Sequence, residues 1–334
     1  MKYDKIVIGA GSAMSTFRLG SQRSRVEVYR PVMGGSPDAS NDERRGDRMS
    51  RARELFRSVL ARSTCTLAAN IFDPLSARIA HMLGYEVCVL SGSVGKAANL
   101  AVPDLVLSNM SDVVDHCRRI IRSADVSLMV DAEDGFGNAV NVMRTVRELE
   151  GAGVSGIEIE DNAVPRQFNV SDPGLVSQSE QVGKLKAAVA ARTDSTTVII
   201  ARTSALAECP LNEALDRIRA YSDTGAEALM LVGAHRGRSD LEAVHRVTRL
   251  PVCLLNPPPE VRNDSDFLAA HGVRILMLGN PTFAVAVQAI YDSLKHLKDG
   301  GALEALHERQ ATPELLRSVN RTDEFIQQQQ TYIP

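Results

Sequence analysis

Short apolar runs alternate with longer amphipathic segments along most of this chain, from Met49 onward. Short runs are typical of buried strands, and apolar residues that recur every three or four positions are typical of helices. The pattern predicts eight strands, at Thr66–Ala69, Val87–Leu90, Ser127–Asp131, Gly156–Glu160, Thr197–Ala201, Ala228–Val232, Val252–Leu255 and Ile275–Leu278. It predicts helices between them, at Pro74–Leu83, Met110–Ser123, Ala139–Ala152, Glu180–Arg192, Leu211–Thr224, Ser239–Thr248 and Asp264–His271.

Strand and helix alternate almost throughout this region. Neighbouring parallel strands need a crossover connection, which a helix supplies. Eight such units fit a closed barrel, and a doubly wound open sheet is the alternative fold. We therefore expect an α/β protein in which residues 51–300 form a (β/α)8 TIM-type barrel and residues 301–334 form a helical tail.

The first 50 residues lack this pattern. The stretch Ser21–Arg53 is rich in Arg, Ser, Gly and Asp and has no apolar periodicity, so residues 1–50 are predicted to be a peripheral or mobile extension. Lys5–Ala13 is similar to the strand and glycine turn of a dinucleotide site. The helix, second strand and acidic residue that such a site requires do not follow, which favours a chance similarity over nucleotide binding.

Composition points to small-molecule chemistry. The chain has 334 residues, of which 44% are hydrophobic and 24% are charged, a balance typical of a globular enzyme with a large core. The net charge of -3 gives no indication of a surface for nucleic acid or for an anionic membrane. Neither an apolar run of membrane-spanning length nor a secretory leader pattern is present, so we expect a cytoplasmic protein.

The cysteines are odd in number and widely scattered. They are Cys65, Cys88, Cys117, Cys209 and Cys253, and no two of them form a CxxC pair. This spacing predicts neither a disulfide framework nor a zinc site. Each lies in an apolar or mixed segment, which favours buried structural thiols over nucleophiles.

Two acidic clusters accompany neighbouring predicted strands. They are Asp131, Glu133 and Asp134 after one strand, and Glu158, Glu160 and Asp161 at the end of the next. The carboxyl ends of all strands of a parallel barrel meet at one mouth, where functional residues lie. Carboxylate oxygens are ligands that Mg2+ prefers. The alternative is that these residues cap the helices that follow.

Other polar groups also follow predicted strands. The sequence Ser91–Ser93 offers backbone N–H groups and hydroxyls for an anion, or forms a plain turn. Arg202 follows a strongly apolar strand, which favours a carboxylate clamp at the barrel mouth over a surface arginine. Asn256 opens a stiff, proline-rich loop after the seventh strand and is a further candidate for the site.

Six segments, in order, resemble signature sequences of the isocitrate lyase/phosphoenolpyruvate mutase superfamily. They are Phe72–Arg78, Leu90–Val94, Val102–Asp104, Asp131–Asn138, Gly156–Asp161 and Ile199–Thr203. The resemblance covers about residues 54–298. The chain is most similar to the oxaloacetate decarboxylase branch, through Leu55–Arg57, Asn141–Val146 and Pro165–Phe168.

The resemblance implies a metal site. Asp131 would bind Mg2+ directly, with Mn2+ as an alternative metal. The residues that would hold its water molecules are Asp104, Glu133 and Glu160. In this family the metal is a Lewis acid that acts on a 2-oxo or 2-hydroxy acid, which passes through a pyruvate enolate.

The resemblance also implies residues that contact the substrate. Together with the groups at the strand ends, it predicts substrate binding by Ser91, Gly92, Ser93, Arg202, Asn256 and Asn280. The predicted catalytic residues are Arg202, Asp104 and Glu160, and Arg202 would stabilise the enolate oxygen or a carboxylate.

Three departures from the family pattern bear on the reaction. Carbon–carbon lyases of the family carry a cysteine where this chain has Phe168, which is neither an acid nor a base. Decarboxylation of a β-oxo acid needs no such group, so a Mg2+-dependent oxaloacetate decarboxylase is the favoured function. Glu133 replaces an aspartate of the family pattern. Pro281 stands where the decarboxylase branch has a histidine, and the neighbouring Asn280 is the candidate to replace that histidine by hydrogen bonding.

Two alternatives stay open at this point. One is another superfamily lyase or a phosphonomutase-type enzyme that acts on a different 2-oxo or 2-hydroxy acid. The other is a catalytically silent barrel that binds a metabolite. The last barrel helix of the family, here Ala284–Leu297, is exchanged between subunits, so the resemblance also implies a homodimer or homotetramer.

Overall fold

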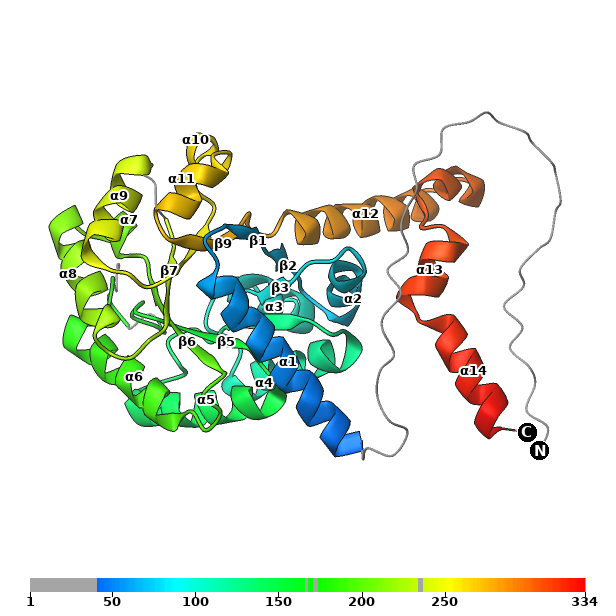
Figure 1. The fold of residues 1–334 in the computed structure, drawn as a ribbon. Helices are drawn as coiled ribbons and strands as arrows, with labels where there is room; N and C mark the ends of the chain where they lie inside the picture. Colours follow the sequence, from blue (N-terminus) through cyan, green and yellow to red (C-terminus); the bar gives the residue numbers. More distant parts are fainter. Residues whose placement is uncertain (1–40, 166–167, 171–173, 234–236, 334) are drawn as a thin grey trace. The chain divides into compact units, whose positions relative to one another are not determined.

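The strands of the protein form a single parallel sheet. The computed structural model describes residues 41–165, 168–170, 174–233 and 237–333 (Figure 1), and the Lys5–Ala13 motif lies outside these residues. Within them the sheet has nine strands in the order β1-β9-β8-β7-β6-β5-β4-β3-β2. The strands are β1 (Thr66–Leu67), β2 (Ala69–Asn70), β3 (Val87–Leu90), β4 (Ser127–Asp131), β5 (Gly156–Glu160), β6 (Val198–Thr203), β7 (Ala228–Leu231), β8 (Val252–Leu255) and β9 (Val273–Met277).

The sheet closes on itself through its first segment. β1 pairs with the last strand, β9, whereas β2 pairs with β3, and Ala68 alone separates β1 from β2. The Ala68 N–H donates to Leu276 O, and the Ile71 N–H donates to Val89 O, which continues both pairings. The predicted (β/α)8 TIM-type barrel is therefore confirmed, and the predicted first strand is divided in two.

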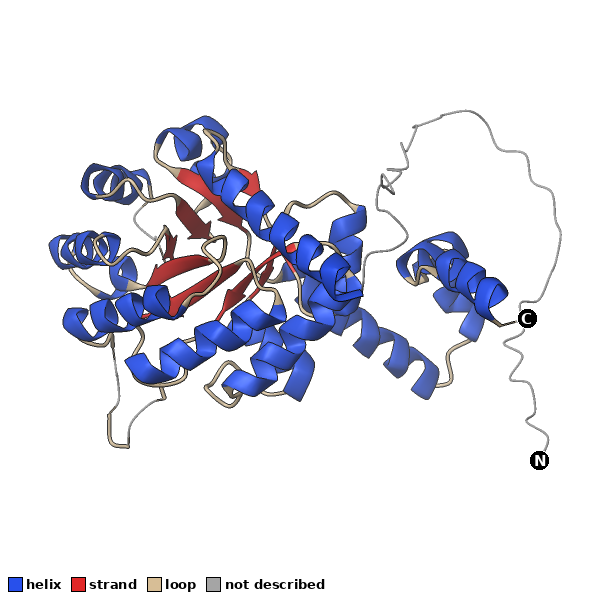
Figure 2. Cartoon of the chain, turned by 60° about the horizontal axis from the view of Figure 1, so that its bottom comes forward, coloured by secondary structure: helices blue, strands red, loops and turns tan. Residues whose placement is uncertain are grey.

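Helices lie between the strands and cover the outside of the barrel (Figure 2). The helices between the first and last strands are α2 (Pro74–Met82), α3 (Gly92–Leu100), α4 (Met110–Ser123), α5 (Ala139–Ala152), α6 (Gln178–Ala191), α7 (Ala205–Glu208), α8 (Leu211–Ser222), α9 (Arg238–Val247), α10 (Pro259–Arg262) and α11 (Ser265–Ala270). The predicted helices are all present, with ends that agree to about two residues. The helices α3, α7 and α10 were not predicted, because α3 is built of small residues and the other two are single turns.

Successive strand residues face opposite sides of the sheet. Val87 and Val89 join a cluster inside the barrel, whereas the alternate residues Cys88 and Leu90 pack against the helices. The interior cluster consists of Phe56, Val59, Leu60, Ala68, Val87, Val89, Met129, Val198, Ile200, Ala228, Met230, Cys253, Ile275 and Met277. This alternation decides which residues of each strand reach the barrel mouth.

The helix α1 (Asn41–Ala61) lies at the end of the barrel where the strands begin, opposite the mouth where they end. Its Phe56 packs at the start of β5, where a Cβ on Gly156 would lie 2.8 Å from the Phe56 ring. Arg53 donates to the Val154 carbonyl at 3.1 Å in the turn before β5. Residues 41–50, which belong to the predicted extension, form the first part of α1, and the predicted domain boundary at residue 50 stays a prediction.

After β9 the chain continues as α12 (Pro281–Lys298), η1 (Leu303–Arg309), α13 (Pro313–Val319) and α14 (Thr322–Tyr332). α13 is tied to α2, because Arg78 Nη1 donates to the Val319 carbonyl at 3.0 Å.

None of the helices in the described ranges has both the length and the apolar character of a membrane span. The cysteines are free, and Cys88, Cys117 and Cys253 are buried, whereas Cys65 and Cys209 are partly exposed.

Candidate active site

The alternation of the strands directs charged side chains into one mouth of the barrel. Met129 belongs to the interior cluster, so Asp131, two residues later on β4, faces the same side. The same step leads from Ile200 to Arg202 on β6. Glu160, at the end of β5, pairs in register with Arg202. The carboxylates and the guanidinium therefore meet where the strands end.

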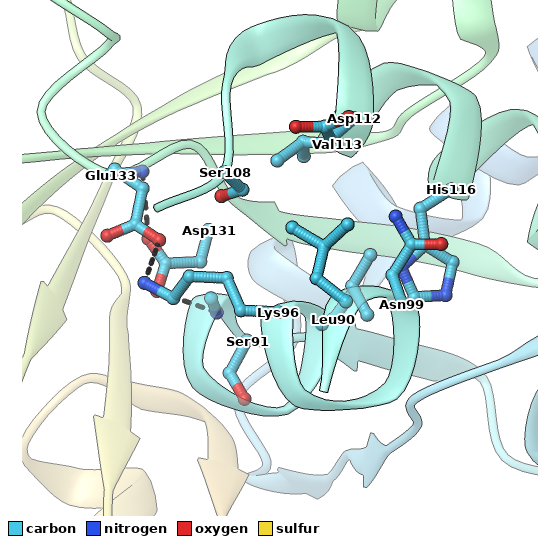
Figure 3. A pocket seen from close by; sticks show the side chains of 13 residues that line it. Leu90, Ser91, Lys96, Asn99, Ser108, Asp112, Val113, His116, Asp131 and Glu133 are labelled. Carbon is cyan, nitrogen blue, oxygen red and sulfur yellow. Dashed lines mark hydrogen bonds and ion pairs between the residues drawn. The ribbon is translucent and has the colours of Figure 1, made fainter. Parts of the chain in front are cut away.

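A cleft of about 830 Å³ opens at this mouth. Nine of the predicted site residues line it, namely Ser91, Ser93, Asp104, Asp131, Glu133, Glu160, Arg202, Asn256 and Asn280. The tenth, Gly92, lines a smaller cavity beside it, together with Asp131 and Glu133 (Figure 3). The predicted residues thus lie together, and the roles assigned to them stay predictions.

Arg202 is the central cation of the mouth. Its Nη1 forms an ion pair with Asp131 Oδ2 and lies 3.3 Å from Glu158 Oε2, and its Nη2 lies 3.1 Å from Glu160 Oε2. Three carboxylates therefore hold the guanidinium in one position. The side chain is 17% exposed, so it is not a surface arginine.

Lys96 is a second buried cation at this mouth, and the sequence pattern did not indicate it. Its side chain, on α3, is 3% exposed. Its Nζ lies 2.6 Å from Glu133 Oε1, a contact drawn in Figure 3, and 3.0 Å from Asp104 Oδ1. Most of the predicted site residues lie at or near strand ends, whereas Lys96 lies inside a helix. The signal that could have revealed it is a lone lysine in a helix of small residues.

Backbone N–H groups fix the carboxylate of Asp131. Its Oδ2 accepts from the Gly92 N–H at 3.0 Å, and its Oδ1 accepts from the Glu133 N–H at 3.0 Å. A Cβ at Gly92 would lie 2.4 Å from Glu133 Oε1 and 3.0 Å from Asp131 Oδ2. Only glycine leaves room here for two carboxylates beside the start of α3. The predicted role of Gly92 in binding a substrate carboxylate is not shown by this contact, because its N–H serves Asp131.

Burial and mutual repulsion change the acidity of these groups. Burial raises the pKa of Glu133 to about 7, with a further contribution from the charge of Asp131. Burial also raises the pKa of Glu158 to about 7 and the pKa of Glu160 to about 8. Burial acts in the same direction on Asp131, but Arg202 and the two backbone N–H groups outweigh it and leave the pKa of Asp131 lowered. Asp131 is therefore the carboxylate that stays ionised most readily.

This donor set fits a divalent cation that keeps most of its water. The buried carboxylates Asp131, Glu133, Glu158 and Glu160 face two cations, Lys96 and Arg202. Glu158 Oε1 is buried without a hydrogen-bond partner. In the described part of the chain, no three acidic, histidine or cysteine side chains enclose a common ion position. A hard cation held by one carboxylate and several waters satisfies these observations.

A neutral cluster of amides and hydroxyls lies at the seam where the barrel closes. Asn280 Oδ1 accepts from Asn70 Nδ2 at 3.2 Å and from Ser91 Oγ at 3.1 Å. Asn280 Nδ2 donates to Ser93 Oγ at 3.4 Å. Asn70 was not predicted, because it ends a strand that carries no other polar signal. The cleft thus has charged groups and uncharged hydrogen-bonding groups in its lining.

The other acidic residues of the two clusters have structural partners outside the cleft. Asp134 Oδ2 lies 3.3 Å from the buried Lys184 Nζ. Asp161 Oδ2 accepts from Thr203 Oγ1 at 2.8 Å and from Tyr221 OH at 2.7 Å. Phe168 is 93% exposed and does not line the cleft.

Sequence comparisons place this barrel among known enzymes. The family model "Phosphoenolpyruvate phosphomutase" matches residues 56–298. An oxaloacetate decarboxylase of Rhodopseudomonas palustris (strain BisB18) is 45% identical over 243 residues, which are 73% of this chain and 84% of that protein. A second one, from strain BisA53, is 41% identical over 271 residues, which are 81% of this chain and 93% of the relative.

Solved structures agree with these sequence matches. A phosphonopyruvate hydrolase complex with oxalate and Mg++ superposes with a TM-score of 0.76 at 28% identity, and the match covers 85% of this chain and 99% of that one. The sequence match and the structural match extend over the same barrel. The chain belongs to the phosphoenolpyruvate mutase/isocitrate lyase superfamily.

Proposed function

We propose that this chain is a Mg2+-dependent carbon–carbon lyase that decarboxylates oxaloacetate or a similar β-oxo dicarboxylate. The observation that carries the proposal is the cleft lining, in which Arg202 is held by carboxylates and which contains no cysteine, histidine or tyrosine among the described residues. Loss of CO2 from a β-oxo acid needs no base to deprotonate a hydroxyl. The relatives named oxaloacetate decarboxylase support the same choice.

The reaction breaks one carbon–carbon bond. The C3–C4 bond of the substrate cleaves, C4 leaves as CO2, and the electron pair moves into the C2–C3 bond, so that negative charge develops on the C2 oxygen. A proton added at C3 then gives pyruvate. A guanidinium fixed near that oxygen stabilises the developing charge without reorganisation, which is the role we propose for Arg202.

The remaining predicted residues would bind and orient. Mg2+, when bound, would supply Lewis-acid stabilisation of the same charge. Asp131 would hold it directly, and the residues that would hold its waters are Asp104, Glu133 and Glu160. Ser91 and Ser93 would orient the substrate carboxylate from the neutral side of the cleft, together with Asn256 and Asn280.

A second candidate function follows from the seam of the barrel. Pro281 is the first residue of α12 and offers no proton donor, and Asn280 before it is engaged by Asn70 and Ser91. A family member that acts on another 2-oxo or 2-hydroxy acid fits this neutral environment as well.

The test is a decarboxylase assay that follows pyruvate with Mg2+ and oxaloacetate. We expect activity well above that of free Mg2+, and a loss of at least about 100-fold in Asp131→Ala, because the direct metal ligand is removed. Wild-type activity no greater than that of free Mg2+ would contradict the decarboxylase proposal. A Mg2+-dependent thermal shift with oxalate, which mimics the planar enolate, would then separate a family enzyme with another substrate from a silent barrel.

We also infer that α12 is exchanged between subunits. None of its residues is buried in the single chain. Its exposed apolar residues are Val285, Val287, Ile290, Tyr291, Leu294 and Leu297. An apolar groove of about 450 Å³ borders α2 and the start of α12, where Leu67, Leu75 and Ile79 line it. The exposed apolar residues of α12 from a second copy of the chain would pack in this apolar groove.

A further inference from the structure

The segment between α3 and α4 borders the cleft and has no regular structure. Residues 101–109 form neither helix nor strand, and most of them are exposed. Four of them, Asp104, Leu105, Val106 and Leu107, nevertheless line the cleft. Leu105 is 60% exposed and Leu107 is 56% exposed. Apolar packing alone therefore holds this segment weakly against the barrel.

One polar contact ties the side chains of residues 102–108 to the barrel, whereas Asn109, at the end of the segment, caps α4. Asp104 Oδ1 lies 3.0 Å from Lys96 Nζ. Across the described ranges, no other side chain of residues 102–108 makes a hydrogen bond or ion pair, and Ser108 Oγ is buried without a partner. The position of residues 102–108 thus depends on Lys96.

Lys96 itself is fixed from the barrel side. Its Nζ lies 2.6 Å from Glu133 Oε1, and the Glu133 N–H is bonded to Asp131 Oδ1. A buried ammonium needs such partners, because an uncompensated charge in the interior is costly. Asp104 is 67% exposed at its side chain, so Asp104 is the partner that is free to move. Asp131 thus fixes Glu133, Glu133 fixes Lys96, and Lys96 in turn holds Asp104 of the segment.

We propose that Lys96 is a positioning residue that holds residues 101–109 at the cleft through Asp104. The same ammonium keeps Asp104 and Glu133, which come from different loops, in a fixed spacing at the metal site. The proposal goes beyond the decarboxylase assignment, because it requires the cleft and its metal site but not a particular reaction.

The first experiment measures the segment itself, in the full chain without metal. Chymotrypsin cleavage after Leu105 and Leu107, located by mass spectrometry, reports whether the segment is released. We expect cleavage in Lys96→Met and in Asp104→Asn to be at least about fivefold faster than in the wild type. Asp104→Asn changes an exposed side chain, so it tests the proposal even if Lys96→Met fails to fold.

The matched control is Lys184→Met. Lys184 is also 3% exposed and is paired with a carboxylate, Asp134, but it does not contact residues 101–109. We expect its cleavage after Leu105 and Leu107 to equal that of the wild type. Equal cleavage rates in the wild type, Lys96→Met and Asp104→Asn would overturn the proposal.

The second experiment is a double-mutant cycle on the binding of Mg2+ and oxalate, measured by calorimetry. We expect Asp104→Asn to weaken binding by about tenfold in the wild-type background and by less than about threefold in Lys96→Met, since Asp104 is no longer held there. Equal factors in both backgrounds would overturn the role of Lys96 at the metal site. If the wild type does not bind oxalate, the proposed function fails, whereas the proteolysis result still decides the position of the segment.

Discussion

Gly92 shows how little space separates the groups at the barrel mouth. A Cβ there would meet Glu133 Oε1 at 2.4 Å, which is closer than any real Cβ contact. We expect Gly92→Ala to displace Glu133 and Asp131 and to weaken the binding of Mg2+ and oxalate by at least about tenfold. Titration calorimetry measures this change directly.

The control for that substitution lies on the same helix. A Cβ at Gly95 would have its nearest neighbour, Leu90 Cδ1, at 3.5 Å, an ordinary contact. We expect Gly95→Ala to bind as the wild type does and to be stabilised by about 0.5–1 kcal/mol, as is usual for alanine in a helix interior. Unchanged binding in Gly92→Ala would refute the crowding argument.

Arg202 carries a prediction about stability. Arg202→Met leaves Asp131, Glu158 and Glu160 without their shared cation, and loss of one partner of a buried ion pair costs about 3–5 kcal/mol. We expect a lower Tm without metal and a larger rise of Tm on addition of Mg2+ than in the wild type, because the uncompensated carboxylates attract the ion. Scanning calorimetry with and without Mg2+ measures both effects.

The control is Arg219→Met, which removes an exposed arginine paired with Asp216. Exposed pairs contribute about 0–1 kcal/mol, so its Tm and its response to Mg2+ are expected to stay close to those of the wild type. If Mg2+ raises the Tm of Arg202→Met no more than that of the wild type, the carboxylates do not bind the ion in the proposed way.

At this scale the sequence indicated most of the residues that lie at strand ends, but it missed Lys96 and Asn70. Asp131 is the last residue of β4 and Arg202 is the last but one of β6, where strand periodicity and the barrel rule together indicate their positions. Lys96 has no such signal, because its side chain reaches the mouth from the second turn of a helix. Glu158 was predicted to belong to an acidic cluster, but no role was predicted for it. Its contact with Arg202 depends on the register of β5 against β6, which the sequence does not show.

The helix α1 shows where element prediction fails and what packing adds. Its polar, arginine-rich first half gives no amphipathic signal, so the sequence predicted an extension up to residue 50. The helix is anchored by tertiary contacts instead, through Phe56 inside the barrel and through Arg53, which donates to Val154 O. Strands buried on both faces were predicted to within about two residues at each end, because most of them are continuous apolar runs.

Phe56→Ala tests the contribution of α1. Phe56 is fully buried, and truncation of such a side chain costs about 3–5 kcal/mol. We expect urea unfolding to show this loss, with the cleft geometry unchanged because α1 lies at the other end of the strands. Val140→Ala, at a position 73% exposed on α5, is expected to change stability by less than about 0.5 kcal/mol. A loss below 1 kcal/mol in Phe56→Ala would mean that α1 does not stabilise the barrel.

At the scale of the whole molecule, the alternation of strands and helices was enough to predict a closed barrel, but not how it closes. The division of the first strand into β1 and β2 depends on which residues meet β9 and which meet β3. Such long-range pairing leaves no local signal in the sequence. The exchange of α12 likewise stays a prediction, because a single chain shows an uncovered helix and a groove but not their partner.

That exchange can be tested by one double substitution. Ile290 and Leu294 are 60% and 64% exposed on α12, and charge at these positions would oppose burial in a second copy. We expect Ile290→Glu/Leu294→Glu to convert a wild-type oligomer into a monomer, measured by light scattering after gel filtration. A wild-type chain that is already monomeric at micromolar concentration would refute the exchange.

The seam of the barrel has a consequence for the order of folding. The hydrogen bond from Asn70 to Asn280 joins residues 210 positions apart, and it forms only when β9 has docked beside β1. Contacts of such sequence separation form late, because a long loop must close before they are made. A nascent chain that ends before β9 would present the charged half of the cleft without its neutral half. Substrate recognition therefore depends on the last step in the completion of the barrel.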